Sequence, residues 1–160
     1  MPSGIKQVFA SKLTDVDTVK RDILGDIRHE GNKWYKYVEM FNTETIAGNA
    51  GDLVSYLATP AAGYDLNRVT TDVSDADPVP VCAGMLLAAW TGTLATSYYG
   101  WVQIKGRATL SNAVAATAAG KRFAADPAND LKGTVLADDF TSIAGVSLNA
   151  TTAVLLDCPL

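Results

Sequence analysis

The sequence contains few of the residues that ordinarily carry chemistry. It has one histidine, His29, and two cysteines, Cys82 and Cys158, which lie far apart and form no C-x-x-C pair. One histidine excludes metal sites that need several histidines from one chain, and Lys33 stands where the zincin motif would place the second one. We expect two part-buried free thiols, as in a protein made in a reducing compartment; a disulfide between them stays open.

The sequence also lacks a basic cluster and a long apolar run. Lys and Arg total 13 against 17 Asp and Glu, a formal net charge of −4, and no basic run is longer than Lys-Arg. A nucleic-acid-binding protein ordinarily has a clustered basic face, so we expect no nucleic-acid partner. No apolar run approaches the ~20 residues that cross a bilayer, and the first residues lack the apolar core of a signal peptide. We therefore expect that the protein is made in the cytoplasm and does not associate with a membrane.

Motifs of common enzyme classes are missing. Gly120-Lys121 looks like the end of a phosphate loop, but Ala115 and Arg122 stand where that motif needs glycine and serine or threonine. No G-x-S-x-G motif of a serine hydrolase is present. A carboxylate pair for glycoside hydrolysis stays open, because such pairs meet only in space. We expect no catalytic residue and no cofactor, and hence no enzyme.

One acidic loop is the best candidate for a metal site. Asp72, Asp75 and Asp77 cluster there, and grouped carboxylates suit calcium. The loop lacks the glycine and the distant glutamate of an EF-hand, so a solvated acidic loop is the favoured interpretation. We expect no metal, although whether one binds the Asp72–Asp77 loop is left open.

Aromatic and glycine-bounded strands are what the sequence does contain. In residues 98–105, Tyr98, Gly100, Val102 and Ile104 alternate with Tyr99, Trp101, Gln103 and Lys105, which is typical of a central strand with two different faces. Arg107–Leu110 is expected to start another strand after Gly106. These residues include no nucleophile or strong metal ligand, so we expect this strand to have a structural role.

The clearest local signal is a β-hairpin. Asp26–Glu30 and Lys33–Phe41 flank Gly31-Asn32, a pair that suits a two-residue turn with positive φ. Further strands are expected at 53–57, 64–69, 81–90, 133–137, 142–148 and 152–157, and a helix of about two turns at most in the alanine-rich residues 113–125. Many short strands separated by turns predict a mainly β fold: a single compact β-sandwich or β-barrel with short helical or irregular segments.

We divide the chain into a polar arm or short helix over residues 1–24 and a β-rich body over 25–160. The arm is expected to become ordered mainly through a partner or another subunit. Val154-Leu155-Leu156 would favour self-association if it formed an edge strand.

Three aromatic residues of the hairpin are the candidate interface. Trp34 lies in a charged strand together with Tyr35 and Tyr37, and aromatic side chains on a β surface can anchor a protein or stack on sugars. Burial in a β core is the alternative interpretation for tryptophan, and it fits Trp90 and Trp101 best.

The order of these signals resembles a known family. Gly25–Val38, Gly51–Val54, Asp72–Asp75, Ala83–Leu86 and Tyr99–Gly106 follow one another as in head decoration, or capsid cement, proteins of tailed bacteriophages. The resemblance covers most of residues 25–160 and rests on structural glycines and aromatics.

The resemblance implies a β-rich body that binds the outer surface of an assembled capsid in many copies. Such a protein bridges neighbouring major capsid subunits and strengthens the shell. It implies the major capsid protein as partner, a homo-oligomer such as a dimer or trimer, location on the virion surface, and no catalytic residues. The alternative is a phage tail or fibre component that recognises a host glycan.

Overall fold

The structure is a computed structural model of the chain, and it describes residues 8–40, 47–59, 63–72, 81–91, 96–112, 119–125, 133–135, 144–148 and 152–158. Its strands are β1 (Val16–Asp17), β2 (Ile27–Glu30), β3 (Lys33–Met40), β4 (Leu53–Thr59), β5 (Gly63–Thr70), β6 (Cys82–Leu86), β7 (Tyr98–Thr109), β8 (Arg122–Ala125), β9 (Gly133–Val135), β10 (Gly145–Ser147) and β11 (Ala153–Asp157). Within these residues every regular element is a strand, which confirms the mainly β prediction.

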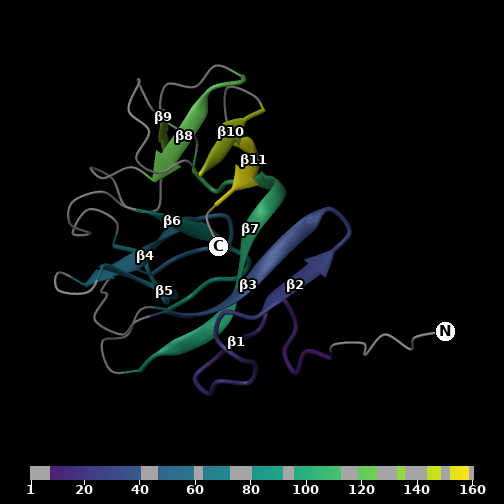
Figure 1. Cartoon of the computed structure of the whole chain (residues 1–160), viewed down its shortest axis with the longest axis vertical. Coiled ribbons are helices and arrows are strands. Elements are labelled where there is room, and N and C mark those ends of the chain that lie inside the picture. Colours follow the sequence, from purple (N-terminus) through teal and green to yellow (C-terminus); the bar gives the residue numbers. More distant parts are fainter. Residues whose placement is uncertain are drawn as a thin grey trace.

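Five strands close a β-barrel. The hydrogen-bonded order runs β3, β5, β4, β6 and β7, and β7 pairs back with β3 (Figure 1). Every pairing is antiparallel except that of β3 with β5, which is parallel and joins Glu39 and Met40 to Arg68 and Val69. Closure leaves these five strands few open edges, the feature that most often makes β proteins aggregate.

The remaining strands extend the barrel in two directions. β2 completes the predicted hairpin with β3, and Gly31 has the positive φ of 61° that its turn requires. On the other side, β11 pairs with the second half of β7 and leads to β10, β8 and β9, which lie above the barrel in Figure 1. β11 lies between β7 and β10 and is no edge strand. Its side chains alternate between two faces, so Leu155 is exposed while Val154 and Leu156 are buried.

β7 is one strand of 12 residues and not two, which corrects the expected break at Gly106. Gly106 has φ of +97°, and a Cβ there would lie 2.6 Å from the Asn32 carbonyl oxygen. The strand therefore continues through glycine, beneath the hairpin turn. Its first half belongs to the barrel and its second half to the β8–β11 sheet.

The two faces of β7 divide the core as the alternation predicts. Val102 and Ile104 belong to the main core, which fills the barrel and continues to Phe123 and Val154 of the upper sheet. Trp101 and Tyr99 lie on the opposite face and form a second, smaller cluster with β3.

The segment before the hairpin packs onto the β-rich body. Residues 8–24 contain no helix; they form turns and the short strand β1, which pairs with Gly100 and Tyr99 of β7. They pack against β3 and β7 of the same chain. Residues 1–7 and 113–118 lie outside the described part, and Arg122–Ala125, at the end of the expected helix, is strand β8. Over the described ranges, no helix is long and apolar enough to cross a membrane.

Candidate functional site

The structure separates the three predicted interface residues. Tyr35 and Tyr37 are buried, at 6% and 0% exposure, and pack with Trp101 in the second core cluster. Burial raises the pKa of both tyrosines. Their side chains lie on the outer face of β3 but are covered, and of the three predicted residues only Trp34 is within reach of a partner, as a half-buried side chain at the edge of the main core.

Residues 8–24 explain why the two tyrosines are buried. Phe9, Leu13 and Leu24 cover the cluster from outside, with the Phe9 ring edge-on to Trp101 at 5.0 Å between centroids. The Arg28 guanidinium lies 5.3 Å from the Phe9 centroid. We call residues 8–24 the N-terminal clamp.

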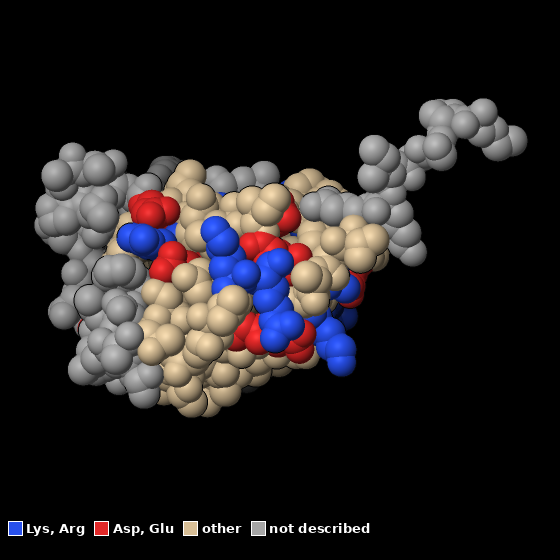
Figure 2. All heavy atoms as spheres, turned by 90° about the horizontal axis from the view of Figure 1, so that it is seen from below, with Lys and Arg blue, Asp and Glu red and all other residues tan. Residues whose placement is uncertain are grey.

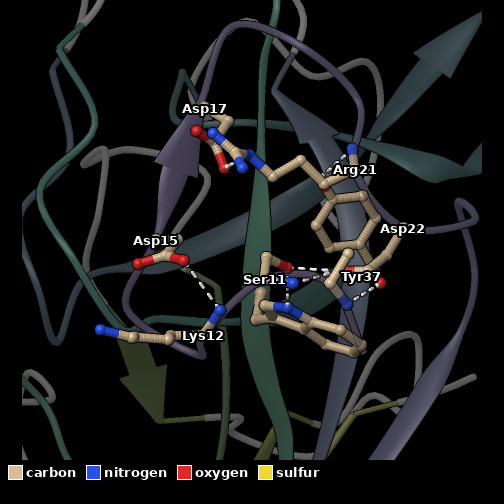
Figure 3. Close-up of polar contacts among 9 residues, drawn as sticks. Ser11, Lys12, Asp15, Asp17, Arg21, Asp22 and Tyr37 are labelled. Atoms are coloured by element: carbon tan, nitrogen blue, oxygen red, sulfur yellow. Dashed lines mark hydrogen bonds and ion pairs between the residues drawn. The ribbon is translucent and has the colours of Figure 1, made fainter. Parts of the chain in front are cut away.

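Polar contacts fix the clamp in place, as Figure 3 shows. The Asp22 carboxylate accepts hydrogen bonds from the amides of Ala10 and Ser11, at 2.8 and 3.1 Å, and from the Ser11 hydroxyl. Trp101 Nε1 donates to Ser11 Oγ at 2.9 Å, and the Arg21 amide donates to the Tyr37 hydroxyl at 3.2 Å. The clamp is thus tied to both β3 and β7.

The outer surface of the clamp is amphipathic. Val19 and Ile23 are 70% and 71% exposed. Figure 2 shows the face that carries β1, where Lys and Arg side chains are interspersed with Asp and Glu. Within the clamp, Arg21 and Asp17 form an ion pair at 2.7 Å. Mixed charge around isolated apolar side chains is the composition of a polar interface rim.

Trp34 lies in a compact group of side chains at the end of the hairpin. His29 stacks on the indole with 4.2 Å between centroids and 20° between planes. Lys105 Nζ lies 5.4 Å from the ring centroid and 3.0 Å from the Asp157 carboxylate. We call His29, Trp34, Lys105 and Asp157 the hairpin cluster. It joins β2, β3, β7 and β11, and its aromatic rings and opposite charges are suited to bind a protein surface.

An open groove of about 350 Å³ adjoins the hairpin. Lys33, Tyr35, Met85, Leu87 and Gln103 are among the residues that line it. Gln103 donates to three carbonyl oxygens of its own strand, at 3.1 to 3.3 Å, so its amide nitrogen holds the backbone of β7. None of the described residues that line this groove is a carboxylate, so they form no acid pair of the glycosidase type.

The barrel interior contains polar groups that the sequence pattern did not reveal. Lys36 is buried and donates from Nζ to the Tyr56 hydroxyl at 3.2 Å, and its burial lowers the pKa of the ammonium group. Tyr56 is fully buried, and this burial, followed by the proximity of Cys158 and Cys82, raises the pKa of its phenol. Alternation along β3 places Lys36 inward, but its charge made an outward position the natural expectation.

Metal ligands do not gather among the described residues, where no three His, Cys, Asp or Glu side chains form a group. Asp72 is described, and its amide donates to Thr70 Oγ1 at 3.0 Å; Asp75 and Asp77 lie outside the described ranges. Both cysteines are free thiols, as expected, but they are buried at 0% and 7% exposure.

Comparison with protein-family models, with curated proteins and with solved structures gives no match.

Proposed function

We propose that this protein is a decoration, or cement, protein of a tailed bacteriophage. In this function it binds the outer surface of the assembled capsid in many copies and bridges neighbouring major capsid subunits. The hairpin cluster carries the proposal, because its exposed rim combines an aromatic anchor with charges of both signs on a rigid barrel. Binding to the assembled shell, and not to free subunits, stabilises the shell by linkage.

Several structural features support a protein that acts by binding to a large partner. The clamp ties residues 8–24 to the body, so little conformational entropy remains to be lost there on docking. Val19 and Ile23 provide apolar contacts on the face of mixed charge. As a homo-oligomer, the protein would engage several capsid sites at once and gain affinity through multivalency.

The hairpin cluster supports capsid binding better than glycan recognition. A sugar needs a free face of an aromatic ring, but His29 already covers one face of Trp34. The Lys105 ammonium is also close to the ring, at 5.4 Å from its centroid. A protein partner can instead pack around the edge of the whole cluster.

The test uses capsids of the phage that encodes the protein, prepared without it. Purified protein is added, capsids are pelleted, bound copies are counted and the melting temperature of the shell is measured. We expect saturation at a fixed, high copy number and a higher melting temperature. Saturation at only a few copies per particle would favour a tail component, and no binding at all would overturn the proposal.

The Trp34→Ala variant tests the hairpin cluster in the same assay. Loss of an interface tryptophan commonly costs about 2 kcal/mol or more, so we expect capsid affinity to fall by about tenfold or more. Leu148→Ala is the control, because Leu148 is 43% exposed and follows β10, beside Ala153 at the opposite end of β11 from Asp157. Equal affinity of both variants, each with an unchanged melting temperature, would exclude Trp34 as the anchor.

A further inference from the structure

The fold brings the two cysteines into contact. Cys82 and Cys158 are 76 residues apart in sequence, yet their sulfur atoms lie 3.3 Å from each other. Cys82 belongs to barrel strand β6, and Cys158 directly follows β11 of the upper sheet. The pair therefore lies at the junction of the two sheets.

Both backbones are held in place around this pair. Cys82 is the partner of Ser55 in the pairing of β6 with β4. The Cys158 amide donates to the Ile104 carbonyl at 3.0 Å, and its thiol is 3.6 Å from the Ala144 carbonyl oxygen. The two sulfur atoms thus face each other because of the fold, and a disulfide bond requires them to approach by only about 1.3 Å.

We propose that Cys82 and Cys158 are a redox site that closes to an intramolecular disulfide when the protein meets a small-molecule disulfide such as oxidised glutathione. The reduced thiols are the form made in a reducing compartment, and the disulfide is the form in oxidising surroundings. The inference is independent of what the protein binds.

The reaction balances as two thiol–disulfide exchanges. The Cys158 thiolate attacks oxidised glutathione, breaks its S–S bond and releases one glutathione thiolate. The Cys82 thiolate then attacks the protein sulfur of this mixed disulfide and releases the second glutathione. The two cysteines lose two electrons and two protons, and one oxidised glutathione gains them as two thiols.

Burial makes this site slow to react in the closed fold. The hydrogen bond with Cys82, and then burial, raise the pKa of Cys158, which lowers its thiolate fraction. Cys158 is the more exposed of the two thiols and lies just beyond β11. Local opening there admits the oxidant, so mild urea is expected to accelerate oxidation.

The test equilibrates the reduced, full-length protein with oxidised glutathione and then counts thiols in denaturant. We expect both thiols to disappear, a monomer on a non-reducing gel, and one cross-linked peptide that contains both cysteines. The bridge closes a loop of about 76 residues, so we expect the melting temperature to rise by roughly 10 °C, with full reversal by dithiothreitol.

The Cys82→Ala variant is the control, and it should give only a glutathione adduct on Cys158. Any of three results in the unmodified protein would overturn the proposal: thiols that stay free, disulfides between molecules, or a melting temperature that does not rise. The decisive measurements are made on the protein without a substitution, so poor folding of the variant would not affect the conclusion.

Discussion

Gly106 shows how closely a single residue is constrained in this fold. It lies where β7 passes under the hairpin turn, with φ of +97° and the Asn32 carbonyl oxygen 2.6 Å from the position that a Cβ would take. Gly120 also has a positive φ, of +83°, but no atom lies within 4 Å of its Cβ position. Substitutions at these two glycines therefore distinguish the cost of backbone strain from the cost of a steric clash.

We predict that Gly106→Ala lowers the free energy of unfolding by about 3 kcal/mol or more, because strain and a backbone clash add. Gly120→Ala should cost only about 1 kcal/mol, from backbone strain alone. Urea unfolding followed by tryptophan fluorescence measures both. Equal losses would show that the hairpin turn moves aside without cost.

Tyr56 makes the free energy of unfolding depend on pH in the alkaline range. Burial raises the pKa of its phenol, so the folded state keeps the proton after the unfolded state has lost it. This contribution is complete below the unfolded pKa near 10 and is lost as pH rises above it, by up to about 1.4 kcal/mol per pH unit.

We predict that Tyr56→Phe flattens this loss. Unfolding free energies are measured in urea between about pH 9 and pH 11, and the difference between the original protein and the variant should shrink steadily above the unfolded pKa of about 10. Lys36 donates to the Tyr56 hydroxyl, so the difference reports on the pair. The lowered pKa of Lys36 acts in the opposite direction, because folding gains stability as pH rises toward the unfolded lysine pKa. A constant difference over this range would contradict the assignment.

For individual residues, the sequence predicted the strand face on which a side chain lies better than whether that side chain is exposed. Alternation correctly placed Trp101 and Val102 on opposite faces of β7. It could not show that Tyr35 and Tyr37 are covered, because the covering atoms come from a polar segment with only a few scattered apolar residues. The contact between Cys82 and Cys158 depends on strand order, which short apolar runs leave ambiguous.

The hydrogen bonds of the N-terminal clamp can be tested by mutation separately from the rest of the fold. Three hydrogen bonds within the clamp converge on the Asp22 carboxylate, whereas the Asp15 carboxylate accepts one from the Lys12 amide, at 2.8 Å. Both carboxylates lie in the same segment, so they form a matched pair for mutation.

We predict that Asp22→Ala opens the clamp at a cost of about 1 to 3 kcal/mol, because the amide and hydroxyl of the buried Ser11 lose their acceptor. Amide hydrogen exchange in residues 8–24 should accelerate, and Trp101 fluorescence should shift to the red. Asp15→Ala should leave both nearly unchanged. Unchanged exchange in Asp22→Ala would mean that the apolar contacts alone hold the clamp.

At the scale of elements, turn chemistry was the reliable signal. Gly31-Asn32 identified the hairpin, and strand positions near 53–57, 64–69 and 81–90 agree with β4, β5 and β6. The continuous β7 was missed because glycine usually ends a strand, whereas here it permits close approach to the turn. The parallel pairing of β3 with β5 joins distant segments, and no local pattern reports it.

The whole molecule has one continuous main core. It extends as one cluster from Tyr56 in the barrel to Phe123 and Leu156 in the upper sheet. Such continuity favours a single cooperative unfolding transition for barrel and upper sheet.

We predict that Phe123→Ala destabilises the molecule by about 3 to 5 kcal/mol in one transition. Tryptophan fluorescence reports on the barrel and hairpin, because Trp34, Trp90 and Trp101 all lie there, and far-ultraviolet circular dichroism reports on both sheets. The two curves should coincide, and Leu155→Ala should change stability by less than about 0.5 kcal/mol. An earlier transition in circular dichroism alone would show that the upper sheet unfolds independently.

Because β3 pairs with β7, the barrel cannot close until a segment some 60 residues further along the chain is made. At about 5 to 20 residues per second, a ribosome needs several seconds to make that segment. Throughout that interval the edge of β3 that pairs with β7, at Tyr37 and Val38 among others, stays open. The nascent hairpin is thus the part of this protein that a chaperone would meet first.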